Sequence, residues 1–333
     1  MRKAISSSRT DKDFGFDPIL PGGALAPKAE QTSLFMALDK GKEAPVVLVG
    51  VSGCGKTASM LAVASTRYSL FIEVGVEGSC KYGDGYISVR KYAVTADSVS
   101  VASLQIRIMC DLIARLELLS DALSKGLNPA EWLQAQLNGA TKEVYTRVKY
   151  LFQKCSGFLP IDRVNSLIEN IQNQRSNRDK SDNQELLFFL DEAHILSNVG
   201  KFHPSLFEAS ITSEREWSAF EAVIYQIHCI YGLRPVCAST TWGIAHAASI
   251  ASAQGKRPGT SQTGILRVTS FPVNQSTEDV KNMLGKVLEE EVLDDQTVFS
   301  QEIFTKLVGR PRYAVRTFCT PTNKMRLQAI GLM

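Results

Sequence analysis

Eight residues, Gly50–Thr57 (GVSGCGKT), constrain the fold more than any other stretch of the chain. They fit the pattern G-x-x-x-x-G-K-[ST]. Glycine at both ends of such a loop permits backbone turns that a residue with a Cβ avoids, so successive N–H groups point at one spot and form a nest for phosphate oxygens. The apolar run Val46–Val49 precedes the loop, and the small apolar stretch Ala58–Ser65 follows it. This order of strand, loop and helix predicts a phosphate-binding (Walker A) loop.

Each position of this loop has an expected role. Lys56 is expected to reach the β- and γ-phosphates of a nucleotide, and the Thr57 hydroxyl to bind Mg²⁺. The amino-terminal end of the following helix adds partial positive charge. We interpret Cys54 as a small side chain that the loop tolerates, in preference to a redox switch. The predicted nucleotide-binding residues of the loop are Gly50, Val51, Ser52, Gly53, Cys54, Gly55, Lys56, Thr57 and Ala58.

A second motif consists of five large apolar residues, Leu186–Leu190, followed by Asp191 and Glu192. It predicts a buried parallel strand that delivers two carboxylates to the edge of the sheet where ligands bind (a Walker B strand). Asp191 is expected to hold Mg²⁺, directly or through water, and Glu192 to orient and deprotonate an attacking water. The tetrapeptide ending at His194 reads DEAH, but helicases with that motif need two RecA-type domains. We therefore interpret His194 as a supporting or packing residue.

The remaining sequence indicates how the chain is divided. We predict a core over residues 28–273, interrupted by a helical insertion at about 97–172, with an irregular arm at 1–27, a helical lid at 274–320 and a ragged tail at 321–333. The strands expected in addition to Val46–Val49 and Leu186–Leu190 are Ser69–Val76, Pro235–Ala238 and Leu266–Phe271, and an amphipathic helix is expected over Trp217–Tyr231. The polar stretch Asn173–Glu185 predicts a solvated loop.

Two further positions are candidates for the site. Ser239 follows the strand expected at Pro235–Ala238, where its hydroxyl contacts a γ-phosphate or, equally well, caps the next helix. Arg312 follows Gly309 in a G-x-x-R arrangement, and in ATPases with a lid such an arginine reaches the phosphates; a basic surface turn is the alternative. The predicted catalytic residues are thus Glu192, Lys56 and Arg312, and the predicted metal ligands are Thr57 and Asp191.

Composition limits the class of protein. With 333 residues, 44% hydrophobic and 21% charged, the chain has the make-up of a globular protein. A net charge of +3 does not require a nucleic-acid partner, although the cluster at 175–180 and Lys256 with Arg257 leave one open. No apolar run approaches the roughly 20 residues of a membrane span, and no apolar segment of a signal peptide follows Met1. Seven cysteines without a C-x-x-C pair predict reduced thiols and an intracellular location, cytoplasm or nucleus.

Four segments together resemble a known family: PVVLVGVSGCGKT, NPAEWLQAQL, LLFFLDEAH and LVGRPRYAVRTF. They are similar to the P-loop ATPase module of Crinkler effectors and retrotransposon-hot-spot proteins, over roughly residues 30–320. The resemblance implies an AAA+/STAND-like (ASCE) parallel α/β fold, often fused to a nuclease-like domain and associated with nuclear targets. It also implies secretion into a host cell if the chain is an effector. It carries the nucleotide and Mg²⁺ roles to Lys56 and Thr57, the acidic pair to Asp191 and Glu192, and the lid arginine to Arg312.

The predicted function is Mg²⁺-dependent binding and hydrolysis of ATP. The alternative is a nucleotide-gated interaction module with little turnover, which regulates a partner or a nucleic-acid-directed activity. A GTPase is disfavoured because no N-K-x-D motif is present. A small-molecule kinase is less favoured because an acid after Asp191 suits activation of water. The expected partner is ATP, with a protein partner, self-association or nucleic acid left open and no membrane.

Overall fold

A computed structural model describes most of the predicted core and a small part of the predicted lid. The described residues are 27–40, 44–50, 54–75, 86, 89–90, 93, 101–138, 140–154, 161–178, 185–202, 216–239, 265–269, 271, 277–285 and 305. The expectations for residues 1–26, for the tail at 321–333 and for most of the lid therefore fall outside the described residues.

The centre of the fold is a five-stranded sheet in which all neighbouring strands are parallel. The strands are β1 (Val46–Val49), β2 (Ser69–Glu73), β3 (Leu187–Asp191), β4 (Arg234–Ser239) and β5 (Leu266–Val268). All five coincide with strands expected from the sequence, and the α/β class is confirmed. The spatial order is β2-β3-β4-β1-β5, so β4 lies between β1 and β3. This order differs from both common doubly wound orders, 3-2-1-4-5-6 and 2-1-3-4-5.

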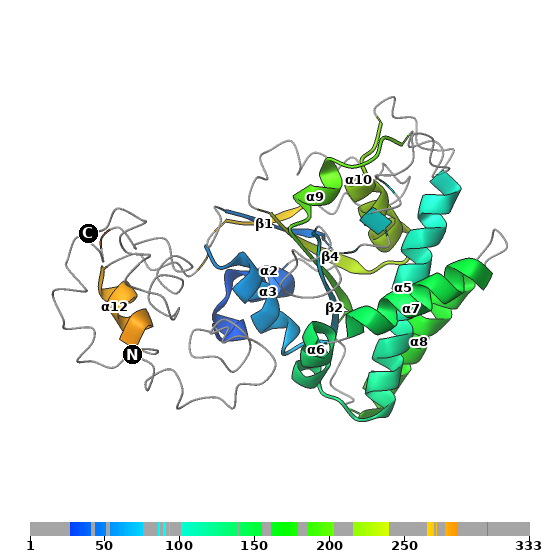
Figure 1. Cartoon of the computed structure of the whole chain (residues 1–333). Helices are drawn as coiled ribbons and strands as arrows, with labels where there is room; N and C mark the ends of the chain where they lie inside the picture. The colour runs from blue at the N-terminus through cyan, green and yellow to red at the C-terminus, as the bar shows by residue number, and fades with distance from the viewer. Residues whose placement is uncertain are drawn as a thin grey trace, which may run out of the picture.

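Helices cover both faces of the sheet (Figure 1). The helices among the described residues are η1 (Ala29–Gln31), α2 (Ser33–Lys40), α3 (Lys56–Ala64), α5 (Val101–Ser124), α6 (Pro129–Asn138), α7 (Ala140–Lys154), α8 (Ile161–Arg178), α9 (His194–Ser197), α10 (Ala219–Ile224), the π-helix η3 (Tyr225–Ile230) and α12 (Thr277–Gly285), and all of them except α12 belong to the body around the sheet. Successive side chains of a strand point to opposite faces. Phe71 and Phe189 accordingly pack with α2 and α3, whereas Leu70 and Phe188 pack with α5 and α10. Burial of both faces explains why these strands are continuously apolar.

The predicted helical insertion is present between β2 and β3 and consists of α5 to α8. In Figure 1, α7 and α8 pack against α5, the longest of the four helices. A capping box begins α6: Glu131 N–H donates to Asn128 Oδ1 (3.0 Å), and Asn128 N–H donates to Glu131 Oε2 (2.8 Å). The capping box fixes the start of α6 at Asn128 and Pro129.

The prediction of a solvated loop from residue 173 is wrong for its first part, because α8 continues to Arg178. Arg175 is buried, and its guanidinium lies 5.4 Å from the centre of the Tyr68 ring. Arg178 Nη1 donates to the Leu127 carbonyl (3.1 Å). Arg175 and Arg178, which the sequence offered as possible nucleic-acid contacts, therefore join α8 to the segments that contain Tyr68 and Leu127. Lys180 lies outside the described residues.

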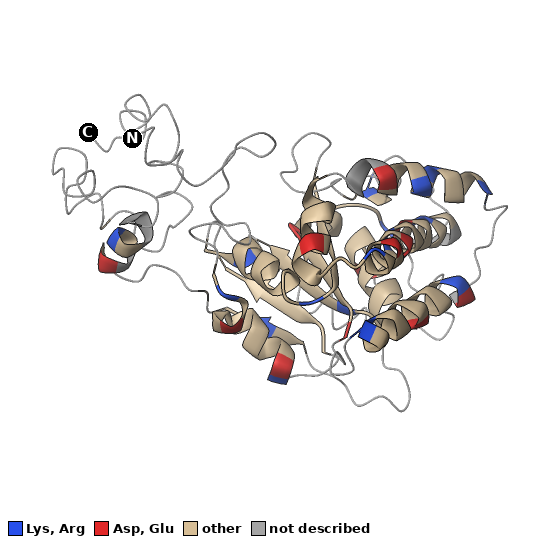
Figure 2. Ribbon diagram, turned by 90° about the horizontal axis from the view of Figure 1, so that it is seen from below, with Lys and Arg blue, Asp and Glu red and all other residues tan. Residues whose placement is uncertain are grey.

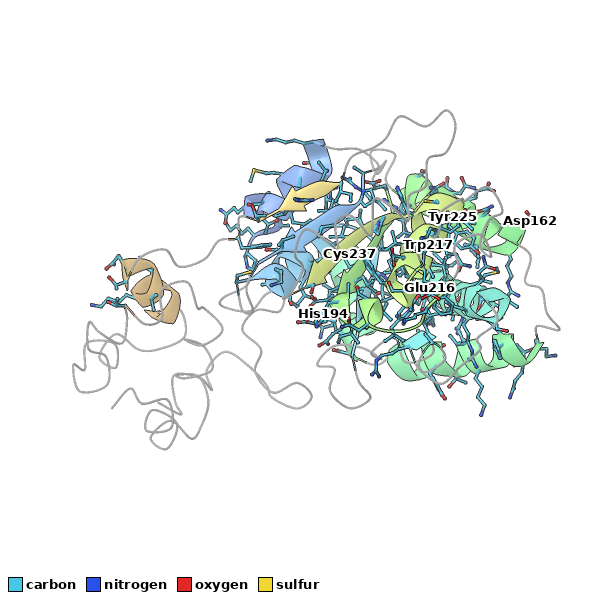
Figure 3. The ribbon with its side chains drawn as sticks, turned by 90° about the horizontal axis from the view of Figure 1, so that it is seen from above. Asp162, His194, Glu216, Trp217, Tyr225 and Cys237 are labelled. Carbon is cyan, nitrogen blue, oxygen red and sulfur yellow. The ribbon has the colours of Figure 1, made fainter. Side chains whose placement is uncertain are left out.

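The helix expected over Trp217–Tyr231 differs from the observed one at its start and in its second half. Its first turn begins only after Ser218, which forms a capping box with Glu221, and α10 then passes into the π-helix η3. Trp217 precedes the helix and forms an isolated antiparallel β-bridge with Phe202, through two backbone hydrogen bonds. Its ring lies 5.3 Å from that of Tyr225, and the two residues appear next to each other in Figure 3. Trp217 therefore anchors the helix entrance and is not part of the helix.

A buried arginine fastens the start of β4. Arg234 Nε donates to the Ala44 carbonyl (2.7 Å), Nη1 donates to the Leu38 carbonyl (3.0 Å), and the guanidinium pairs with Glu185. One side chain thus links β4 to the end of α2 and to the segments that lead into β1 and β3. Its position aligns the three strands that carry the predicted site.

Charges on the insertion are mixed. Figure 2 shows acidic and basic residues interspersed along its helices, and several of them pair. Arg147 contacts Asp121 and Glu143 at 2.9 Å, and Arg163 contacts Glu117 at 2.5 Å. The four cysteines among the described residues are thiols rather than disulfides, as predicted; they are Cys54, Cys110, Cys229 and Cys237. Of the helices in the described part of the chain, none combines the length and apolarity that crossing a membrane requires.

Side chains of α6 cover the outer edge of β2. Gln136 accepts from the Phe71 N–H (2.9 Å) and donates to the Ser69 carbonyl (3.1 Å), and the Trp132 indole N–H donates to the same carbonyl (2.7 Å). An uncovered edge strand presents unpaired backbone groups to other chains. Helix α6 therefore protects the outer edge of the sheet through Trp132 and Gln136.

We expect Gln136→Leu to destabilise the protein by about 1–3 kcal/mol, because it leaves a buried N–H without its acceptor, and to increase aggregation. Urea unfolding and light scattering measure both effects. Gln134→Leu is the matched control, since Gln134 lies on the same helix but is exposed. Equal stabilities of the two variants would show that the edge does not depend on Gln136.

Candidate phosphate-loop site

Gly50 and Gly55, the two described glycines of the loop, are needed for different reasons. Gly55 precedes α3 with φ of 100°, a left-handed conformation that favours glycine, as the sequence predicts. Gly50 does not have a positive φ. A Cβ at Gly50 would lie 2.7 Å from Cys54 Sγ and 3.2 Å from the Phe271 ring. The expectation of a special backbone conformation is therefore wrong for Gly50, which is required for close packing. Val51, Ser52 and Gly53 lie outside the described residues.

The Lys56 ammonium group is folded into the loop. Lys56 is buried, its Nζ donates to the Gly50 carbonyl (2.7 Å), and it lies 3.7 Å from Cys54 Sγ. Lys56, Thr57 and the buried Ala58 form the first turn of α3. The first N–H groups of a helix have no partner within it, and together with the lysine they form a positively polarised end that suits an anion.

The phosphate loop and the acidic strand meet at one hydrogen bond. Thr57 Oγ1 donates to Asp191 Oδ2 at 2.7 Å, across 134 positions of sequence. Asp191 is the last residue of β3, and its other oxygen, Oδ1, accepts from the Glu192 N–H (3.0 Å). Both carboxylate oxygens are therefore fixed, and the structure brings together the two residues that the sequence predicts as metal ligands.

The electrostatics of Asp191 are unusual for a carboxylate. Burial raises its pKa to about 6, and the nearby Glu192 and Glu73 carboxylates act in the same direction. The hydrogen bonds from Thr57 and from the Glu192 backbone oppose this shift. A buried carboxylate near other acids is stabilised by a cation, so the site favours a positive charge beside Asp191.

The spacing of Thr57 Oγ1 and Asp191 Oδ2 fits two neighbouring ligands of a magnesium ion. Mg²⁺ prefers octahedral oxygen ligands at about 2.0–2.1 Å, and adjacent ligands of such an octahedron are about 3 Å apart. The Thr57 and Asp191 oxygens lie 2.7 Å apart, close to that spacing. Within the described part of the chain, no cluster of three or more His, Cys, Asp or Glu side chains could hold a metal.

Glu192 adopts a backbone conformation that is uncommon for a residue other than glycine, with φ of 51°. Its carboxylate Oε2 lies 3.4 Å from His194 Nδ1. The next residue, Ala193, donates its N–H to the Ala238 carbonyl of β4 (2.9 Å). The turn after β3 is thus fastened to the neighbouring strand, and it places the Glu192 carboxylate beside His194.

Of the other residues predicted for the site, Ser239 is described by the structure and Arg312 is not. Ser239 is fully buried at the end of β4, in register with Val49, the last residue before the loop. It therefore lies at the same edge of the sheet as Asp191. Arg312 lies outside the described residues, as do Lys256 and Arg257.

Sequence reasoning missed two contributors to this edge. Glu73 ends β2 in register with Asp191, and its charge raises the pKa of that residue. Phe271 follows β5 and packs close to Gly50. The single acid within the predicted strand Ser69–Val76 was a signal for Glu73. Phe271 had no such signal, since it reads as one more apolar residue.

Comparisons with protein-family models, with curated proteins and with solved structures gave no match for this chain.

Proposed function

We propose that the protein binds and hydrolyses ATP in the presence of Mg²⁺. The observation that carries this proposal is the 2.7 Å hydrogen bond between Thr57 and Asp191, which joins the first turn of the loop helix to the end of the acidic strand. The parallel sheet, with a strand between the loop strand and the acidic strand, is compatible with a P-loop ATPase. We also propose the likeness to the Crinkler and retrotransposon-hot-spot ATPase module. The burial of Trp132 and Leu133 in the NPAEWL helix is compatible with it.

In this proposal each residue has a physical task. The N–H groups at the start of α3 and the Lys56 ammonium bind the phosphates, and Thr57 and Asp191 hold Mg²⁺, which offsets the negative charge that develops on the phosphates. Lys56 exchanges its bond to the Gly50 carbonyl for phosphate oxygens. Glu192 orients the attacking water and accepts its proton. Ser239 lies at the same edge and contacts the terminal phosphate or the water.

The proposal predicts the behaviour of Lys56→Ala. Loss of a charged hydrogen-bond donor is expected to weaken ATP binding by about 10- to 100-fold and to remove measurable turnover. Equilibrium binding of a fluorescent ATP analogue and phosphate release, both with Mg²⁺, measure these effects. Lys149→Ala, an exposed lysine on α7, is the matched control.

Two results would count against the proposal. Unchanged ATP binding by Lys56→Ala would show that the loop is not the nucleotide site. Tight binding by the wild-type protein without any phosphate release would instead favour a nucleotide-gated interaction module. Repeating both assays with DNA tests whether nucleic acid is a partner.

A further inference from the structure

We propose that His194 is a positioning residue for Glu192 and that its Nδ1 atom, not its Nε2 atom, holds the Glu192 carboxylate for reaction. This inference rests on the proposed function, because it concerns the residue that is to activate water. It gives a role to the histidine that follows the acidic pair, which the motif alone leaves as a supporting or packing residue.

The geometry around Nδ1 carries the inference. His194 begins α9, directly after the turn that ends β3 (Figure 3). Its Nδ1 is buried and makes no hydrogen bond to any described residue. The Glu192 Oε2 atom lies 3.4 Å away, at an angle that does not yet make a hydrogen bond. A buried donor without a partner is unfavourable. A small rotation of the Glu192 side chain would satisfy both groups when Nδ1 carries the proton.

Hydrogen bonds hold the backbone around Glu192, so the orientation of its carboxylate depends on its side-chain torsions. The Glu192 N–H is bonded to Asp191, and the Ala193 N–H is bonded to the Ala238 carbonyl. The left-handed φ of Glu192 sets the direction in which its side chain leaves the chain. Only the side-chain torsions are then free. A contact with His194 restricts them, and a restricted carboxylate loses less freedom when it meets a water molecule in line with a phosphate.

Three substitutions at one position separate the two ring nitrogens. His194→Asn places an amide N–H close to the position of Nδ1, whereas His194→Gln places one close to the position of Nε2. His194→Phe keeps a ring without any donor. We expect His194→Gln and His194→Phe to lower kcat for ATP by about tenfold with KM unchanged, and His194→Asn to stay within about threefold of the wild type.

The measurements are phosphate release over a range of ATP concentrations, ATP binding, and thermal unfolding of each variant. Retained ATP binding shows that a variant is folded. If all three variants turn over ATP like the wild type, the inference is wrong while the proposed function stands. Equal losses in His194→Asn and His194→Gln would overturn the assignment to Nδ1. A wild-type protein that binds ATP without hydrolysing it would overturn the proposed ATPase activity itself.

Discussion

Replacing Glu192 with glutamine is expected to lower ATP turnover by about 10²- to 10⁴-fold while ATP still binds. Glutamine has nearly the same size and still accepts hydrogen bonds, but it cannot take up a proton from water. The phosphate-binding groups, Lys56 and the start of α3, are unchanged by this substitution. Phosphate release at saturating ATP and equilibrium ATP binding, measured on the same preparation, give the two quantities.

The control for this experiment is Glu143→Gln, which removes the same charge from an exposed position on α7. It is expected to leave turnover unchanged. Full hydrolysis by Glu192→Gln would remove Glu192 from the mechanism. The contact between Thr57 and Asp191 would then still support nucleotide binding, and the source of water activation would have to lie elsewhere.

Replacing Asp191 with asparagine is expected to stabilise the protein in EDTA at neutral pH. The pKa of Asp191 is raised from 3.8 to about 6, so the folded state disfavours the ionised carboxyl. Wild-type stability is therefore lost as pH rises from about 4 to about 6, and it stays lower above that range. Two pH units correspond to about 3 kcal/mol. An asparagine can keep both hydrogen bonds: its oxygen accepts from the Glu192 N–H, and its amide donates to Thr57 Oγ1.

Urea unfolding of both proteins in EDTA, near pH 5 and near pH 7.5, measures this effect. The stability advantage of Asp191→Asn is expected to double over this range, from about 1.5 kcal/mol near pH 5 to about 3 kcal/mol near pH 7.5. Mg²⁺ with ATP is expected to reverse the order, because only the carboxylate supplies a charged ligand. A ligand at 1,000 times its Kd stabilises by about 4.1 kcal/mol, which exceeds the advantage of about 3 kcal/mol that the variant has in EDTA. If the variant is the less stable protein at pH 7.5 in EDTA, burial does not dominate at Asp191.

Much of the site could be predicted because its chemistry is local in sequence. Gly55 and Lys56 belong to a spaced motif, and each of the five runs that the sequence predicts as strands is a strand of the sheet. Parallel strands bring their carboxyl ends to one edge. For that reason two segments with the right chemistry, ending at Thr57 and Asp191, could be expected to meet, and they do.

Other features depend on tertiary contacts that periodicity does not record. The end of α8 looked like a loop because its last residues are polar. Arg175, however, lies against the Tyr68 ring, and Arg178 donates to the Leu127 carbonyl, both distant in sequence. The role of Gly50 follows from the approach of Phe271, which is distant in sequence. Gln136 looked like an ordinary polar residue of a helix, and only the exposed edge of β2 gives it a function.

The place of β4 has a consequence for how the protein acquires its site during synthesis. A nascent chain that has emerged as far as residue 200 already contains both motifs. The sheet position between β1 and β3 is filled only by residues 234–239, which come later. Until the ribosome has delivered them, the loop and the acidic strand lack the neighbour that spaces them. We therefore expect truncated chains ending near residue 205 to carry every recognisable motif of this edge and still not bind nucleotide.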